Sequence, residues 1–156
     1  MNKKTLRERY ALSVYNSILK NIEKETGNKS TYSNDLERIA KQKLGISFKG
    51  VFPSDRIPYL NSIYRYAILN LDSSMDAGSH WIAIAHDYEK NITYCYDSFG
   101  RKNVKIIPKL KLSGNGRIID TDRDAEQDIR EENCGARSLA WLVFYDLYGS
   151  KASLLI

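Results

Sequence analysis

Residues 80–97 read HWIAIAHDYEKNITYCYD, and this stretch decides the fold. It holds two runs rich in β-branched and aromatic residues, 80–85 and 92–97, with a polar segment between them. Runs of this composition on either side of a short polar segment are typical of two antiparallel strands joined by a loop. The sequence therefore predicts a β-hairpin near the middle of the chain.

The register of this hairpin depends on the length of its loop. With residues 87–90 as a four-residue loop, His86 faces Asn91, and counting back along both strands sets His80 opposite Asp97. Directly opposed residues have β-carbons about 4.5 to 5.5 Å apart, close enough for a carboxylate to accept a hydrogen bond from an imidazole N–H. A slip of one residue would remove this pairing, so the prediction depends on the loop length.

Helical patterns lie on both sides of the hairpin. Residues 5–26 carry apolar side chains at three- and four-residue intervals, and Thr5 with Glu8 matches a capping box at the start of that helix. A second helix is expected over about residues 34–44. A third, over residues 134–148, has an apolar set of helical spacing and is closed by a glycine.

The remaining segments complete the predicted fold. Short strands are expected at residues 63–71 and 117–119. Gly and Pro residues punctuate residues 48–58, which favours a surface loop, and a proline leaves residues 104–112 open between strand and helix. Helices, then a small sheet, then a helix predict an α+β fold in a single domain spanning residues 1–156.

Composition restricts the class of protein. The chain has 156 residues, of which 42% are hydrophobic, and a formal net charge of +5. No apolar run approaches the roughly 18 residues of a membrane span, and no signal-peptide stretch opens the chain, so we expect a cytosolic or nuclear setting. The two cysteines, Cys95 and Cys134, argue against a disulfide framework. Clustered basic residues are compatible with a solvated surface or with a contact to a polyanion.

Cys134 has the features of a reactive thiol. It begins the last predicted helix, where unpaired backbone N–H groups and the positive end of the helix dipole favour a thiolate. His80 would serve as its base, and Asp97 would orient the imidazole. Gly135 leaves the substrate's approach clear of a side chain, and the Cys134 N–H with the Gln127 amide would face a developing oxyanion.

Each of these residues also has an interpretation without catalysis. A lone cysteine at a helix start is commonly a small buried hydrophobe, and a histidine in an apolar strand is commonly a satisfied core residue. Asp97 is compatible with beginning a turn, and Gln127 alone carries almost no information. A zinc site built from the two histidines and the two cysteines has no supporting ligand spacing, so we expect no metal.

Several ordered elements resemble a known protease family. They are GVFPSDRIP at 50–58, GSHWIA at 78–83, YDSFG at 96–100, Gln127, and NCG at 133–135. Together they are similar to the adenovirus maturation protease (adenain) family and the wider group of Ulp1-like cysteine proteases. The gaps of 17 residues from His80 to Asp97 and of 7 from Gln127 to Cys134 match the adenovirus branch. The resemblance covers about residues 31–149.

The resemblance implies a papain-like α+β fold and roles for particular residues. His80, Asp97 and Cys134 take the triad positions. Gln127 contributes to the oxyanion hole, and Trp81 lies beside the active site, against the substrate. The resemblance also implies an endopeptidase that cuts viral capsid and core precursors at Gly-Gly or Gly-Xaa sites during virion maturation. Small proteases of virophages and polinton-like elements look closest in compactness.

Expected partners and location follow from the same resemblance. We expect a monomer that acts on capsid precursors in the virion and in the cytoplasm or nucleus of the infected cell, without a membrane partner. The resemblance includes activation by DNA and by a disulfide-linked peptide. No cysteine lies between Asp97 and Cys134, so covalent peptide activation is not expected. No cofactor is expected to be required, and DNA is a candidate activator.

Two other functions stay open at this stage. One is removal of ubiquitin-like modifiers, which also end in Gly-Gly, although a chain this short has little extra surface for gripping a modifier domain. The other is a basic nucleic-acid-binding or capsid-associated protein with an inactive protease fold. The intact set of His80, Asp97, Gln127 and Cys134 argues against the second.

Overall fold

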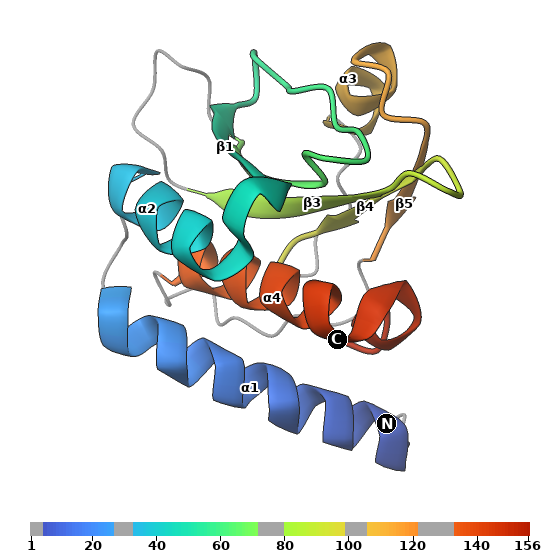
Figure 1. Ribbon diagram of the computed structural model, residues 1–156. Helices are drawn as coiled ribbons and strands as arrows, with labels where there is room; N and C mark the ends of the chain where they lie inside the picture. The colour runs from blue at the N-terminus through green and yellow to red at the C-terminus, as the bar shows by residue number, and fades with distance from the viewer. Residues whose placement is uncertain (1–4, 27–32, 72–79, 99–105, 122–132) are drawn as a thin grey trace.

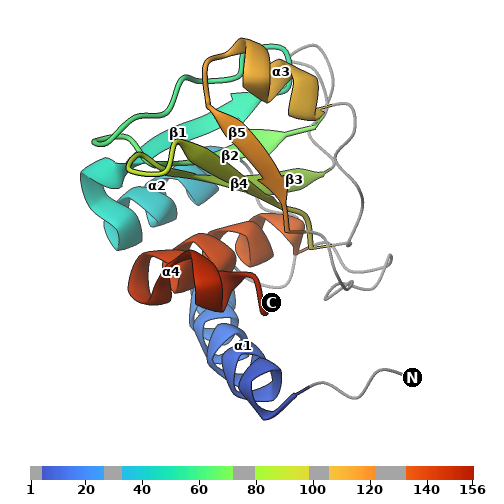
Figure 2. The ribbon, with the colours of Figure 1, turned by 90° about the vertical axis from the view of Figure 1, so that its right-hand side faces the viewer.

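A sheet packed between helices forms the centre of the molecule (Figures 1 and 2). The computed structural model describes residues 5–26, 33–71, 80–98, 106–121 and 133–156. Its elements, in order, are α1 (Leu6–Thr26), α2 (Ser33–Leu44), a 3₁₀ turn (Gly45–Ser47), β1 (Phe48–Pro53), β2 (Tyr66–Asn70), β3 (Trp81–Asp87), β4 (Ile92–Tyr96), α3 (Ile106–Leu112), β5 (Arg117–Asp120) and α4 (Cys134–Ser153).

The strands of the described part form one mixed sheet in the order β1-β2-β3-β4-β5. The central pairs β2–β3 and β3–β4 are antiparallel, whereas the outer pairs β1–β2 and β4–β5 are parallel. Helices α1, α2 and α4 lie on one side of the sheet, and α3 lies on the other (Figure 2). The predicted α+β fold, with a small mixed sheet and Cys134 at the start of a helix, is confirmed.

The helices follow the sequence patterns closely. At the start of α1, the Glu8 N–H donates to Thr5 Oγ1 (3.2 Å) and the Thr5 N–H donates to Glu8 Oε2 (2.6 Å), which is the predicted capping box. The last helix runs beyond its predicted end, because a further turn follows Gly149, whose φ of 81° interrupts the helical backbone. None of the described helices combines the length and the apolarity that a membrane span requires.

The prediction of a surface loop over residues 48–58 is wrong for its first half. Residues 48–53 form β1, which pairs in parallel with β2. A strand at the sheet edge tolerates proline where no ladder hydrogen bond needs its missing N–H, and Pro53 is the last residue of β1. Gly50 lies at an irregularity in the pairing, so both residues that suggested a loop are accommodated within a strand.

The predicted hairpin register is also corrected. His86 lies opposite Thr93 and not opposite Asn91, so the loop comprises residues 88–91. Asn91 has a left-handed φ of 51°, which asparagine tolerates better than most residues, and its carbonyl accepts the Arg117 N–H (3.0 Å). The shift is by two residues. Because side chains alternate between faces with a period of two, an even shift keeps every residue on its predicted face.

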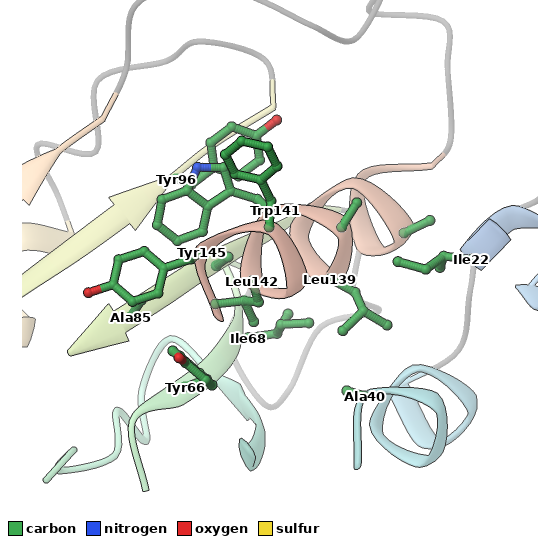
Figure 3. Close-up of a cluster of buried hydrophobic side chains, with 14 of the residues drawn as sticks. Ile22, Ala40, Tyr66, Ile68, Ala85, Tyr96, Leu139, Trp141, Leu142 and Tyr145 are labelled. Atoms are coloured by element: carbon green, nitrogen blue, oxygen red, sulfur yellow. The ribbon is translucent and has the colours of Figure 1, made fainter. Parts of the chain in front are cut away.

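The main hydrophobic core fills the space between the sheet and α1, α2 and α4 (Figure 3). Trp141 of α4 is fully buried, and its ring stacks on Tyr96 of β4 with centroids 5.2 Å apart and planes 4° apart. Tyr145, one turn further along α4, meets the edge of Tyr66 of β2 at 5.8 Å. Aromatic contacts of this size dominate core energetics, so they fix how α4 lies on the sheet.

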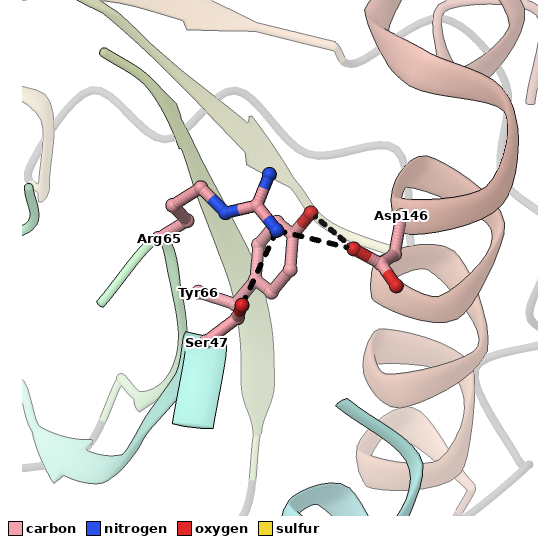
Figure 4. A network of polar contacts seen from close by, with 4 residues as sticks. All are labelled: Ser47, Arg65, Tyr66 and Asp146. Atoms are coloured by element: carbon pink, nitrogen blue, oxygen red, sulfur yellow. Dashed lines mark hydrogen bonds and ion pairs between the residues drawn. The ribbon is translucent and has the colours of Figure 1, made fainter. Parts of the chain in front are cut away.

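Polar contacts fasten the same helix to β2 (Figure 4). The Tyr66 hydroxyl donates to Asp146 Oδ1 (2.8 Å), and Arg65 Nη2 lies 3.5 Å from the same oxygen. Arg65 also donates to Ser47 Oγ (3.2 Å). Burial and the hydrogen bond to Asp146 raise the pKa of Tyr66, so its hydroxyl keeps its proton as a donor.

A smaller apolar cluster covers the opposite face of the sheet. Its buried members come from the strands, from α3 and from the segment before β2: Leu60, Ala67, Leu69, Ile82, Ile84, Cys95, Ile106 and Leu110. Burial raises the pKa of the Cys95 thiol well above its ordinary value. This cysteine is therefore a neutral core residue, on the face away from α4.

Two glycines with left-handed backbone conformations, one of them just before β5, test how much a close backbone contact contributes to stability. Gly116 has a φ of 71°, and a Cβ there would overlap the backbone carbonyl oxygen of Asn91, whereas a Cβ at Gly45 (φ 63°) would meet nothing within 4 Å. We expect Gly45→Ala to lower the free energy of unfolding by about 1 kcal/mol and Gly116→Ala by roughly 2 kcal/mol more. Urea unfolding measures both, and equal losses would contradict the predicted clash.

Candidate active site

His80 and Asp97 meet at one end of the sheet. His80 directly precedes β3 and Asp97 directly follows β4, so the antiparallel pairing brings them to the same edge. His80 Nε2 lies 2.9 Å from Asp97 Oδ1, and the two residues are only 7% and 2% exposed. The corrected register makes this a diagonal contact across the pair, because Asp97 follows a residue that pairs with Ala83. Diagonal neighbours remain within reach of long side chains.

Cys134 lies at the same end of the sheet, but it belongs to helix α4. It is the first residue of α4, and it is 5% exposed. A turn further along the helix, the Ser138 hydroxyl donates to the Trp81 carbonyl (3.2 Å), which fixes the start of α4 beside the start of β3. His80 directly precedes Trp81, so this bond places Cys134 beside the imidazole, and the interaction with Cys134 helps to raise the pKa of His80.

The surroundings of His80 favour its protonated form. Burial works to lower its pKa, but the hydrogen bonds with Asp97 and Cys134 and the charges of these two groups raise the pKa to about 9, from an ordinary 6.5. The interactions with the partners therefore outweigh the cost of burying the charge. At neutral pH the site therefore holds an imidazolium beside Asp97 and Cys134.

Comparison with known proteins identifies the family of this chain. The profile of the adenovirus endoprotease family matches residues 48–150, which is more than half of the chain and includes His80, Asp97 and Cys134. The chain belongs to the adenovirus endoprotease family. Members of this family are viral cysteine endopeptidases, so the chain is a protease, as its resemblance to adenain predicted. No match was found among curated proteins.

The other predicted site residues of this adenovirus-type endoprotease differ in how far the structure bears on their roles. Gly135 follows Cys134 in the first turn of α4 and is buried. Trp81 is 5% exposed and packs in the main core, so its role against the substrate stays a prediction. Gln127 lies outside the described residues. Within the described ranges, no three His, Cys, Asp or Glu side chains are arranged to hold a metal ion.

Sequence reasoning missed the residues that hold the start of α4 in this endoprotease. Asn133, just before Cys134, donates to Glu23 Oε1 of α1 (2.8 Å) and accepts from Arg137 Nε (3.2 Å). Glu23 lies 110 positions away in the chain, and no local pattern predicts such a contact. Asn133 itself belongs to the quoted NCG string, but that string gives no indication of its partners.

The raised pKa of His80 predicts how stability depends on pH. The native state keeps a proton on His80 up to about pH 9, whereas the unfolded chain loses it near pH 6.5. The free energy of unfolding is therefore expected to fall as the pH rises through this window and to be independent of His80 below it. Urea unfolding at a series of pH values should show the fall in the wild type but not in His80→Gln.

His86 provides the matched control for this experiment. It is buried beside Thr93, with Nδ1 2.7 Å from Thr93 Oγ1, and burial lowers its pKa, so it makes no alkaline contribution of the same sign. The variant His86→Gln should keep the alkaline loss of stability. The same loss in His80→Gln as in the wild type would show that another group causes it.

Proposed function

We propose that Cys134 is the nucleophile of a peptide hydrolase, that His80 is its acid–base partner, and that Asp97 orients the imidazole. One observation carries this proposal: His80 Nε2 lies 2.9 Å from Asp97 Oδ1, and the imidazole also interacts with Cys134, which stands at the start of α4. Since Nε2 faces the carboxylate, Nδ1 is the nitrogen that serves the thiol. A helix N-terminus stabilises a thiolate, so all three groups have the environment that their roles require.

The chemistry proceeds through a thioester. The sulfur of Cys134 attacks the carbonyl carbon of the scissile bond, and the backbone N–H of Cys134 with the side chain of Gln127 stabilises the resulting oxyanion. The protonated His80 then donates its proton to the departing amine as the C–N bond breaks. Water, losing a proton to His80, attacks the thioester, and the thiolate leaves to restore the enzyme.

The substrates that we infer are viral capsid and core precursor proteins, cut at Gly-Gly or Gly-Xaa sites. Family membership supports a role in virus maturation, and we propose a kinship with the proteases of virophages and polinton-type elements. We infer a monomer, acting in the virion and in the infected cell. DNA is a candidate activator, because Lys109 and Lys111 of α3 and Arg117 of β5 expose positive charge on neighbouring elements.

Replacing the proposed nucleophile is the direct test of this function. Cys134→Ala should abolish cleavage of a Gly-Gly-containing capsid precursor, because no thiol remains to form the thioester. Cys95→Ala is the matched control, since Cys95 is buried on the opposite face of the sheet. Cleavage by the control at close to the wild-type rate is expected, and circular dichroism checks that both variants fold.

The same assay separates the alternative functions. A ubiquitin-like protein ending in Gly-Gly and fused to a reporter is incubated in parallel with the precursor. Cleavage of the fusion alone would favour a deconjugating protease. Cleavage of neither by the wild type would favour an inactive protein, and turnover that persists in Cys134→Ala would refute the assignment of the nucleophile.

The role of Asp97 has its own test. Asp97→Asn replaces the carboxylate that accepts from His80 Nε2 with a neutral amide, so the imidazolium loses its charged partner. We expect kcat to fall by roughly a hundredfold or more. Asp87→Asn, at the opposite end of β3, should leave kcat unchanged, because Asp87 contacts its own hairpin loop through the Lys90 N–H. A near-normal rate for Asp97→Asn would mean that another group orients His80.

A further inference from the structure

Helix α1 lies outside the family match and still touches the neighbours of two proposed catalytic residues. It spans Leu6–Thr26, whereas the match begins at residue 48. It runs along α4 on the side away from the sheet (Figures 1 and 2) and buries Ala11, Tyr15, Leu19 and Ile22. The Tyr15 hydroxyl lies 3.1 Å from that of Tyr96, and Glu23 accepts from Asn133. These two partners directly precede Asp97 and Cys134.

The contact between Glu23 and Asn133 concerns the start of α4. Asn133 is the N-cap residue of this helix, and asparagine side chains at that position usually accept a hydrogen bond from the second or third helical N–H. Here the side chain makes no such capping bond. Its Nδ2 donates to Glu23 Oε1 (2.8 Å), and its Oδ1 accepts from Arg137 Nε (3.2 Å), so both ends of the amide are held elsewhere.

Charges on both sides of the amide keep this arrangement in place. Glu23 comes from α1, and Arg137, only 9% exposed, lies at the end of the first turn of α4. Hydrogen bonds to charged groups are stronger than those between neutral groups, so together they outcompete the single neutral bond that a cap would form. The carboxylate and the guanidinium have opposite charges, so the pair adds little net charge beside His80 and the thiol.

We propose that Glu23 is a positioning residue that holds the Asn133 side chain away from the start of α4, so that the first N–H groups of this helix stay directed at Cys134 and its substrate. The proposal rests on the function proposed above. A capping side chain over these N–H groups would neutralise part of the positive helix end. It would also occupy an N–H of the first helical turn that otherwise stays available to the thiolate.

The test compares variants with a readout that needs no substrate. In Glu23→Ala only the bond from Arg137 still holds the Asn133 amide, so this side chain is expected to turn and cap α4, and kcat should fall roughly three- to tenfold while KM stays within about twofold. The pH midpoint for alkylation of Cys134 by iodoacetamide should move to higher pH, with Cys134→Ala as the blank. The melting temperature should not fall below that of Glu25→Ala.

Glu25→Ala is the matched control. Glu25 lies on the same helix and pairs with Lys43 (3.2 Å) rather than with Asn133, so kcat and the alkylation profile should stay at wild-type values. Glu23→Gln keeps an oxygen that accepts from Asn133 and should retain most of the activity. In an Asn133→Ala background, which removes the capping side chain, Glu23→Ala should have no further effect.

Two results would overturn the positioning role. One is a wild-type kcat and alkylation profile in Glu23→Ala. The other is an equal loss from Glu23→Ala in the presence and in the absence of the Asn133 side chain, because Glu23 would then act by another route. The alkylation profile separates this proposal from the protease assignment. A shifted profile without cleavage of any peptide refutes the protease function alone, and normal cleavage with an unshifted profile refutes the positioning role alone.

Discussion

The placement of α4 on the sheet is the constraint on which the rest of the structure depends. Most of this helix is buried, and it contacts the sheet through the Trp141 ring, stacked on Tyr96 one residue before Asp97. The hydrogen bond from the Ser138 hydroxyl to the Trp81 carbonyl is a second contact between α4 and the sheet, one residue after His80. Aromatic packing and one hydrogen bond thus bring the first residue of the helix to the end of the two central strands. A shift of α4 by one turn along its axis would move the thiol about 5 Å away from its present position beside the imidazole.

The buried pair of His80 and Asp97 is better explained by chemistry than by stability. Removing two charges from water costs several kcal/mol per ion, and a well-packed apolar pair often stabilises a protein at least as well. Here burial works to lower the pKa of His80, yet the pKa is raised to about 9. The carboxylate and the thiol therefore more than offset the desolvation of the imidazolium. An arrangement that keeps an imidazole charged inside a protein suits the acid–base role proposed for His80.

Much of the fold follows from local patterns, and the site follows from them in part. Helical periodicity and the capping box at Thr5 predicted α1 almost to the residue, because these signals act over three or four positions. The predicted hairpin register was wrong by two residues because Asn91 belongs to the loop and not to β4. A shift by an even number of residues leaves each side chain on its predicted face of the sheet. The contact between His80 and Asp97 was therefore still predicted. Strand β1 was missed because glycine and proline within an edge strand look the same as a loop.

No local pattern predicts the environment of the proposed nucleophile, Cys134, because the residues around it come from distant segments. Cys134 depends on the sheet end formed by β3 and β4, on the docking of α4, and on Glu23 of α1, which reaches Asn133 across 110 positions. Helix α1 packs mainly against α4, and its Tyr15 hydroxyl also reaches the Tyr96 hydroxyl of β4 (3.1 Å), so it joins the helix that carries the thiol to the strand that precedes Asp97. The surroundings of this thiol therefore require the sheet, α4 and α1 together, which is why no single stretch of sequence predicts them.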